Sequence, residues 1–298
     1  MDTNALQAFI SVAQNASFSK AADQLYLTQS AISKRIALLE QQLGCRLFDR
    51  IGRTISLTEA GVTLLPRAQQ VLIELDDARR ALDNLAGGIT GKLSLATSHH
   101  ISLHRLPPLL KCFTQTYPDV ELDLRFAESE VAYEGVLKGE LELALITLSP
   151  NPDINIQSEV IWEDQLSYVV APDHPLSSAT SLELAQLTAY PAILPSSNTF
   201  TRQLVEALFA KHDLSLTVSM STNYLDTIRM MVSIGLGWSL LPESLITADL
   251  TVLPVNATPV KRPLGAIVHR NRTLSNAASK LLEILRTDAR QVQPDALL

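Results

Sequence analysis

Two short helical patterns joined by a tight turn near the start of the chain constrain its fold more than any other feature. Ser17 stands where an N-cap belongs, directly before a helical pattern at 18–25, and Thr28 has the same position before a second pattern at 29–42. Gly44 follows that second pattern as a helix stop. The spacing predicts a helix-turn-helix, an arrangement that places the second helix in the major groove of DNA.

The first turns of the second helix carry polar and basic side chains suited to DNA. A Gln amide bonds an adenine edge in two places, a Ser hydroxyl meets several bases, and Lys or Arg reaches phosphate groups. The candidate DNA contacts on this helix are Thr28, Gln29, Ser30, Ser33, Lys34 and Arg35. Residues 46–50 and 54–57 then predict two short strands, a wing, with Arg50 and Arg53 as candidates for phosphate or minor-groove contact.

Helix caps and small residues of this kind also occur in other small three-helix domains, so the pattern alone does not decide between such a domain and a helix-turn-helix.

The chain of 298 residues has a formal net charge of −7, but residues 1–57 hold six Lys or Arg against four Asp or Glu. This small excess predicts that DNA binding depends on a few placed cations, doubled by dimerisation, rather than on a strong positive field.

The N-terminal residues resemble those of the LysR-type transcriptional regulators. The resemblance is carried by Phe9, Ser17 to Ala22, Leu25, Thr28 to Ser33, Ile36, Leu39, Glu40, Leu43, Gly44, Leu47, Phe48, Arg50, Thr58 and Gly61. One departure is Ser30, where many members carry Pro, and both residues suit a first helical turn. The resemblance extends more loosely over the rest of the chain, and it implies a bacterial regulator that binds double-stranded promoter DNA through residues 1–57.

A seam of apolar residues with heptad-like spacing follows the wing. Its residues alternate in steps of four and three and are Leu64, Ala68, Val71, Leu75, Ala78, Leu82 and Leu85. An ordinary core-facing helix would show a similar pattern, but the opposite face of this segment is polar. The resemblance implies that residues 58–86 form a linker helix that pairs two subunits, in a homodimer that assembles further into a homotetramer. Glycines within 87–91 predict a hinge.

From residue 92 onward strand and helix patterns alternate, which predicts an α/β fold with mainly parallel sheets. Strands are expected at 92–96, 120–126, 143–146, 166–170, 192–194, 217–221, 238–241 and 262–268, and helices at 103–116, 131–138, 199–211, 226–234 and 277–286. The resemblance implies an effector domain with the fold of periplasmic binding proteins. Its subdomain I is expected at 92–161 and 266–298, and its subdomain II at 162–265.

Two polar segments, each between a strand and a helix, are the candidates for effector binding. Ligands of such folds lie beyond the carboxyl ends of parallel strands, and hydroxyls with free N–H groups at a helix start suit an anion such as a carboxylate. Simple helix capping is the alternative for both segments. The candidates are Thr97, Ser98, His99 and His100 in the first segment, Ser196, Ser197, Asn198 and Thr199 in the second, and Ser129, Thr147 and Asn223, which the family layout assigns to the wall of the site.

Other classes of function find little support in the sequence. His100 and His104 can share a helical face, but their segment offers no further metal ligands, and Cys45 and Cys112 fit neither a disulfide framework nor a zinc site. No G-x-S-x-G, Walker A or H-E-x-x-H motif occurs, so we predict no enzymatic activity, no cofactor and no metal. No secretory signal or long apolar span is present either, which predicts a cytoplasmic protein without membrane contact.

Together these features predict a sequence-specific DNA-binding transcriptional regulator whose promoter binding is modulated by a small anionic metabolite. One alternative is a regulator that binds DNA without any effector. The other is a solute-binding or enzymatic α/β domain, which the attached helix-turn-helix opposes.

Overall fold

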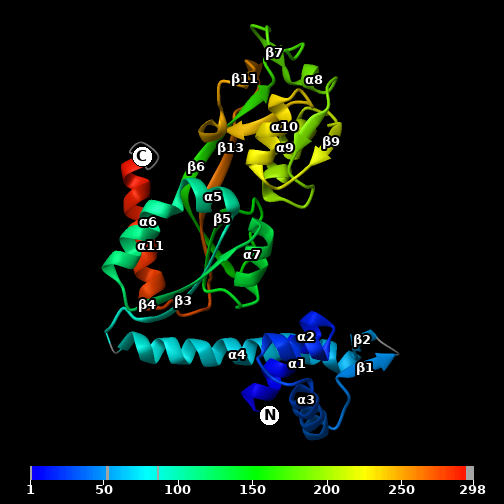
Figure 1. The fold of residues 1–298 in the computed structure, drawn as a ribbon, viewed down its shortest axis with the longest axis vertical. Helices are drawn as coiled ribbons and strands as arrows, with labels where there is room; N and C mark the ends of the chain where they lie inside the picture. Colours follow the sequence, from blue (N-terminus) through cyan, green and yellow to red (C-terminus); the bar gives the residue numbers. More distant parts are fainter. Residues whose placement is uncertain (1, 52–53, 86, 293–298) are drawn as a thin grey trace. The chain divides into compact units, whose positions relative to one another are not determined.

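The chain divides into two compact units, residues 1–86 and residues 87–298 (Figure 1). The computed structural model describes residues 2–51, 54–85 and 87–292. The predicted wing residue Arg53 lies outside the described residues, as does the side chain of Arg50, whose backbone belongs to strand β1 (Phe48–Ile51).

The first unit is a winged helix-turn-helix, which confirms the predicted fold. Its elements are α1 (Thr3–Asn15), α2 (Phe18–Gln24), α3 (Gln29–Leu43), the antiparallel strands β1 (Phe48–Ile51) and β2 (Thr54–Leu57), and α4 (Glu59–Leu85). The Ser17 hydroxyl accepts a hydrogen bond from Lys20 N, and the Thr28 hydroxyl accepts one from Ala31 N, so both predicted N-caps are present. Gly44 ends α3 in the left-handed conformation, with φ +69°.

An aromatic and aliphatic core joins the three short helices to the wing. The ring centroid of Phe48 in β1 lies 5.4 Å from that of Phe9 and 5.8 Å from that of Phe18. Ile32 and Ile36 of α3 are fully buried in the same core. Because this packing fixes one face of α3 inward, the opposite face is exposed to solvent.

Helix α4 continues from the core of the first unit. The Thr58 hydroxyl accepts a hydrogen bond from Gly61 N at 3.1 Å and caps the start of the helix, which runs through Pro66. Ala68 of the apolar seam is buried in the core of this unit. The later seam residues are exposed in the single chain, namely Val71, Leu75, Leu82 and Leu85.

The second unit has the predicted α/β fold. Its elements are β3 (Gly91–Thr97), α5 (His99–His104), α6 (Leu106–Thr116), β4 (Val120–Phe126), α7 (Ser129–Leu137), β5 (Leu143–Thr147), β6 (Ile156–Val170), β7 (Leu182–Glu183), α8 (Leu184–Leu187), β8 (Ala192–Leu194), α9 (Phe200–Lys211), β9 (Val218–Ser221), α10 (Leu225–Ser233), β10 (Ser239–Pro242), a 3-10 turn (Glu243–Leu245), β11 (Thr251–Val252), β12 (Val255–Asn256), β13 (Val260–His269) and α11 (Asn276–Val292).

The main sheet of this unit is mixed rather than mainly parallel. Its strand order is β10–β6–β13–β5–β3–β4, and β11 also pairs with β6. Strand β3 runs parallel to β4 and β5, whereas β13 runs antiparallel to β5 and β6. The reason is that the chain leaves the first subdomain (β3, β4 and β5 with α6, α7 and α11) on β6 and returns on β13 (Figure 1). The expected subdomain boundaries at 161/162 and 265/266 fall inside these two crossing strands.

Helices cover both faces of the first subdomain's sheet. Helices α6 and α11 pack on one face, where Leu95, Phe113 and Leu281 are fully buried (Figure 1). Helix α7 packs on the other face, over Ala144 and Ile146. In the second subdomain, the parallel strands β8 and β9 share a separate core with α9.

The helix expected at 103–116 is in fact two helices. Helix α5 begins at His99 and ends at His104, and α6 starts at Leu106 with Pro107 and Pro108 in its first turn. Proline is accepted in a first turn because those N–H groups have no helical partner, so the pair starts a new helix instead of continuing α5. The segment after β3 is consequently helical, and not the loop that the sequence suggested.

Candidate functional site

The first turns of α3 present the predicted DNA contacts to solvent. Gln29, Ser30 and Lys34 are exposed, and Ser33 and Arg35 are partly exposed. The Thr28 hydroxyl caps α3 and lies 3.0 Å from the Ser30 hydroxyl, and both residues are exposed. Thr28 therefore caps the helix at its exposed end, where it and Gln29 both remain predicted DNA contacts.

The turn before α3 contains a candidate that the sequence pattern did not single out. Tyr26 is 96% exposed and has a φ of +53°, a left-handed conformation that is uncommon for a bulky residue. Its hydroxyl can donate a hydrogen bond to a DNA phosphate beside α3. The available signal was a large aromatic residue inside a predicted turn.

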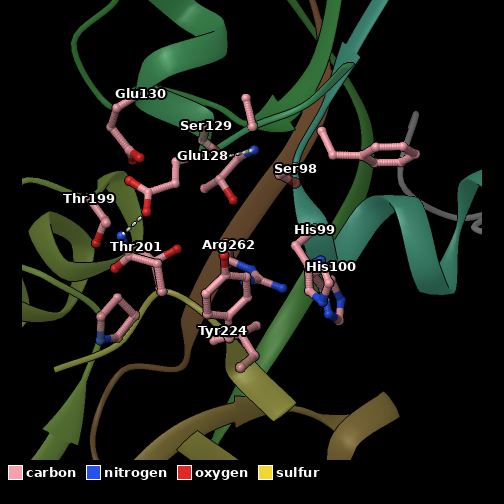
Figure 2. Close-up of a pocket in the computed structure, with 16 residues that line it drawn as sticks. Ser98, His99, His100, Glu128, Ser129, Glu130, Thr199, Thr201, Tyr224 and Arg262 are labelled. Atoms are coloured by element: carbon pink, nitrogen blue, oxygen red, sulfur yellow. Dashed lines mark hydrogen bonds between the residues drawn. The ribbon is translucent and has the colours of Figure 1, made fainter. Parts of the chain in front are cut away.

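A cavity of about 150 Å³ lies between the two subdomains of the second unit (Figure 2). The first subdomain contributes Ser98, His99, His100, Phe126, Ala127, Glu128, Ser129, Glu130 and Thr147. The second subdomain and the crossing strand β13 contribute Pro195, Thr199, Thr201, Asn223, Tyr224, Leu225 and Arg262. A molecule bound there would touch both subdomains.

Seven of the predicted effector contacts line this cavity, namely Ser98, His99, His100, Ser129, Thr147, Thr199 and Asn223. The other four do not. Thr97 is completely buried within β3, and its hydroxyl is 3.3 Å from the Ser98 carbonyl oxygen. Ser196 is held in a turn, where its N–H donates to Asn223 Oδ1 at 2.9 Å. Ser197 and Asn198 are exposed to solvent outside the cavity.

The start of α9 is occupied by side chains of the protein itself. Glu130 of α7 accepts a hydrogen bond from Phe200 N at 2.6 Å, and the Thr199 hydroxyl accepts one from Arg202 N. A carboxylate at a helix N-terminus is stabilised by the helix dipole and by the otherwise unpaired N–H groups. The expectation that this helix start offers free N–H groups to an effector is therefore not met at Phe200 and Arg202.

Contacts across the cavity connect the two subdomains. Besides the bond from Phe200 N to Glu130, the Asn223 amide donates to Glu128 Oε1 at 2.7 Å. The rings of His99 and Tyr224 meet edge to face, with centroids 5.1 Å apart. Burial raises the pKa of Glu130, and the nearby Glu128 carboxylate adds to the rise.

A buried cluster of charges borders the cavity through His100 and Arg262, whereas its other two members, Asp164 and Arg105, line a separate pocket. Asp164 of β6 and Arg262 of β13 face each other across the crossing strands and form a salt bridge, with side chains 2% and 3% exposed. Arg105 Nη2 lies 3.1 Å from the other Asp164 oxygen. His100 Nε2 lies 3.3 Å from Asp164, within ion-pair distance but outside hydrogen-bond geometry. Arg262 Nε is buried and has no hydrogen-bond partner among the residues that the structure describes.

This cluster carries a net positive charge. Burial by itself raises the pKa of Asp164, but His100 and Arg262 outweigh that effect and hold the pKa well below its usual range. Burial lowers the pKa of His100, an effect that Arg262 strengthens and Asp164 opposes. The lowered pKa favours the uncharged form of His100, and a single carboxylate, that of Asp164, faces the guanidinium groups of Arg105 and Arg262.

Sequence reasoning missed the charged residues of the cavity. Arg262 was assigned only to a strand, and Glu128 and Glu130 were not considered. The usable signal was the basic pair Lys261 and Arg262 in the strand Val260–His269, since a strand turns one of two neighbouring side chains inward and a buried charge needs a partner.

The histidines do not form a metal site in the described part of the chain. His100 and His104 do share a helical face, with ring centroids 4.8 Å apart. However, no group of three or more His, Cys, Asp or Glu residues converges there among residues 2–51, 54–85 and 87–292. Cys45 and Cys112 are both free and exposed.

Two known protein families match separate parts of the chain. The family described as "Bacterial regulatory helix-turn-helix protein, lysR family" matches residues 3–62, and the "LysR substrate binding domain" matches residues 86–290. The chain belongs to the LysR family of transcriptional regulators. As a LysR family member, it is a DNA-binding transcriptional regulator with an effector-binding domain, and not an enzyme.

Relatives and solved structures extend this similarity over nearly the whole chain. The uncharacterized HTH-type transcriptional regulator YybE of Bacillus subtilis (strain 168) is 31% identical over 280 residues, which are 93% of this chain and 96% of that protein. A full-length OxyR variant from Pseudomonas aeruginosa covers 97% of this chain and 95% of its own, at 22% identity and a TM-score of 0.70. The effector-binding domain of QuiR, solved in complex with shikimate, covers 68% and 98%, at 21% identity and a TM-score of 0.62. These two structures show a shared fold.

No helix in the described segments is both long enough and apolar enough to cross a lipid bilayer.

Proposed function

We propose that a small anionic metabolite binds in the cavity of the second unit and modulates the binding of promoter DNA by the first unit. The observation that carries this proposal is the Arg262 guanidinium in the cavity wall, which is 3% exposed and shares its carboxylate partner, Asp164, with Arg105. An anion there would offset the excess charge and would meet few competing water molecules. QuiR, which has the same fold, binds shikimate, a carboxylate.

The position of the cavity supports a regulatory role. Because its walls come from both subdomains, a ligand favours whichever arrangement of the two gives it more contacts. The segment 87–91 joins the second unit to α4 and is the proposed hinge, since Gly87 and Gly91 both have positive φ. Residues 1–57 are the proposed DNA-binding domain and residues 58–86 the proposed linker.

On the DNA side, we assign base contacts to Gln29, Ser30 and Ser33 and phosphate contacts to Lys34 and Arg35. Exposure of these side chains at the start of α3 supports the assignment. Arg50 and Arg53 of the wing are proposed as further phosphate or minor-groove contacts. A regulator of this kind acts in the cytoplasm, where bacterial DNA lies.

The unit of DNA binding is proposed to be a homodimer formed through α4, which assembles further into a homotetramer. Four exposed apolar residues at heptad-like spacing support pairing with a second copy of the helix, namely Val71, Leu75, Leu82 and Leu85.

A thermal-shift screen of the full-length protein against small carboxylates tests effector binding. Ligand present at about 100 times its Kd should raise the Tm of the second unit by about 5 °C or more. Ser98→Ala should abolish the rise, because Ser98 lines the cavity and makes no capping hydrogen bond that its loss would break. Ser197→Ala is the matched control, since Ser197 is exposed outside the cavity.

If the ligand raises the Tm of the Ser98→Ala variant as much as that of the wild type, the effector does not bind in this cavity. If no carboxylate or amino acid raises the Tm while the protein still binds promoter DNA, the small carboxylate is excluded, and the alternatives are an effector-independent regulator or an effector of another chemical class.

A further inference from the structure

Charge is unevenly distributed across the cavity. In Figure 2, Glu128 and Glu130 lie on one side, Ser98, His99 and His100 lie on the other, and Arg262 lies between them. One wall is therefore acidic, whereas on the side toward His100 the Arg262 guanidinium shares its carboxylate partner with Arg105, which leaves an excess of positive charge there. A simple anion would complement only the second of these surfaces.

The acidic wall lacks a cation of the protein's own. Glu130 accepts a hydrogen bond from Phe200 N, and Glu128 accepts one from the Asn223 amide, and both donors are neutral. Within the described ranges, no Lys, Arg or His lies at ion-pair distance from either carboxylate. Two neighbouring carboxylates without a counter-charge attract a cationic group, and they repel a second anion at the start of α9.

The basic side offers donors that nothing else uses. Arg262 is only 3% exposed, and its Nε has no hydrogen-bond partner in the described part of the chain. The Ser98 hydroxyl, which also lines the cavity, makes no capping bond to α5. A buried guanidinium with an unused donor is best satisfied by a carboxylate, whose two oxygens match its geometry.

We propose that the effector is a small zwitterion of the amino-acid class, with its carboxylate toward Arg262 and Ser98 and its ammonium group toward Glu128 and Glu130. The inference rests on the proposed function and narrows its ligand class. A cavity of about 150 Å³ holds roughly ten water-sized groups, which suits a molecule of amino-acid size.

Matched ligands test this proposal by calorimetric titration of the full-length protein. The common α-amino acids are compared with the 2-hydroxy acids in which a hydroxyl replaces the amino group, and with the amines that lack the carboxylate. We expect at least one amino acid to bind about tenfold or more tightly than both of its analogues, because each analogue leaves one charged surface unpaired.

Charge-removing variants show where the ammonium group binds. Glu130→Gln keeps an oxygen that accepts a hydrogen bond from Phe200 N but loses the negative charge. Glu128→Gln likewise keeps an oxygen that accepts from the Asn223 amide and loses the charge. Each should weaken amino-acid binding about tenfold and should not weaken binding of the 2-hydroxy acid, which the lost charge only repelled. Glu134→Gln is the matched control, because Glu134 lies on the same helix, pairs with Lys138 and does not line the cavity.

The outcomes separate this proposal from the proposed function. If 2-hydroxy acids or other carboxylates bind as tightly as amino acids, or if the Gln variants affect both classes alike, the zwitterion is excluded and the anionic effector stands. If neither class binds, the zwitterion is excluded, and the thermal-shift screen against other carboxylates decides whether an anionic effector binds.

Discussion

Asp164 is the residue on which the charge balance of the cavity depends. It is the carboxylate that Arg105, Arg262 and His100 all face, so Asp164→Asn leaves a fully buried guanidinium without a counter-charge. Loss of one partner of such a pair costs about 3 to 5 kcal/mol of folding free energy. We expect the free energy of unfolding to fall by that amount when the full-length variant is denatured with urea at neutral pH and the unfolding transition of the second unit is monitored.

The neighbouring residue provides the control for this measurement. Glu163→Gln removes a carboxylate that pairs with Lys261 at 2.8 Å on the surface, which should cost less than about 1 kcal/mol. Because the pKa of Asp164 is lowered from 3.8, its stabilisation is present above that pH and is lost as acid protonates the folded carboxylate. The difference between wild type and Asp164→Asn should therefore shrink at low pH, and a difference that stays constant with pH would contradict the ion-pair role.

At the scale of single elements, α4 is the helix with the largest uncovered apolar surface in the first unit. Leu82 is 69% exposed and Leu85 is 83% exposed, and exposure of such apolar side chains to water is unfavourable for a helix without a partner. Leu82→Glu places a charge in the proposed seam of each partner and should raise the dimer dissociation constant about tenfold or more, measured by light scattering across a dilution series. Asp83→Ala, one position along and off the seam, should leave it unchanged. Equal masses for wild type and Leu82→Glu at every concentration would exclude pairing through this face.

The elements also show what sequence reasoning can reach. The caps of α2 and α3 were predictable, because Ser17 and Thr28 bond to N–H groups three residues away. The break before α6 was not predicted, although Pro107 and Pro108 were visible, because a proline pair is equally compatible with a kinked helix. In the second unit, the polar residues that follow strand ends predicted about half of the residues that line the cavity.

The other half of the cavity depends on contacts that are remote in sequence. Arg262 meets Asp164 across 98 positions of the chain, and Phe200 meets Glu130 across 70. No local pattern encodes these pairings, since they require the register of β6 against β13 and the closure of two subdomains. Such long-range contacts also determine which N–H groups a ligand finds free.

At the scale of the whole molecule, regulation requires that the cavity and the DNA surface prefer the same state of the protein. The strands β6 and β13 run through both subdomains, so a ligand that bridges the subdomains biases their arrangement. Coupling between two binding sites is reciprocal, and the ligand must change the affinity for DNA by the same factor as DNA changes the affinity for the ligand. With a DNA fragment selected by the protein in vitro, we expect both factors to be equal and in the range of about 5 to 150.

Glu130→Gln should reduce ligand affinity with and without DNA to the same extent, because Glu130 belongs to the cavity and not to the DNA surface. A ligand that binds the cavity while the affinity for DNA stays the same would show that the cavity does not regulate DNA binding, since a ligand without differential affinity for two states shifts neither.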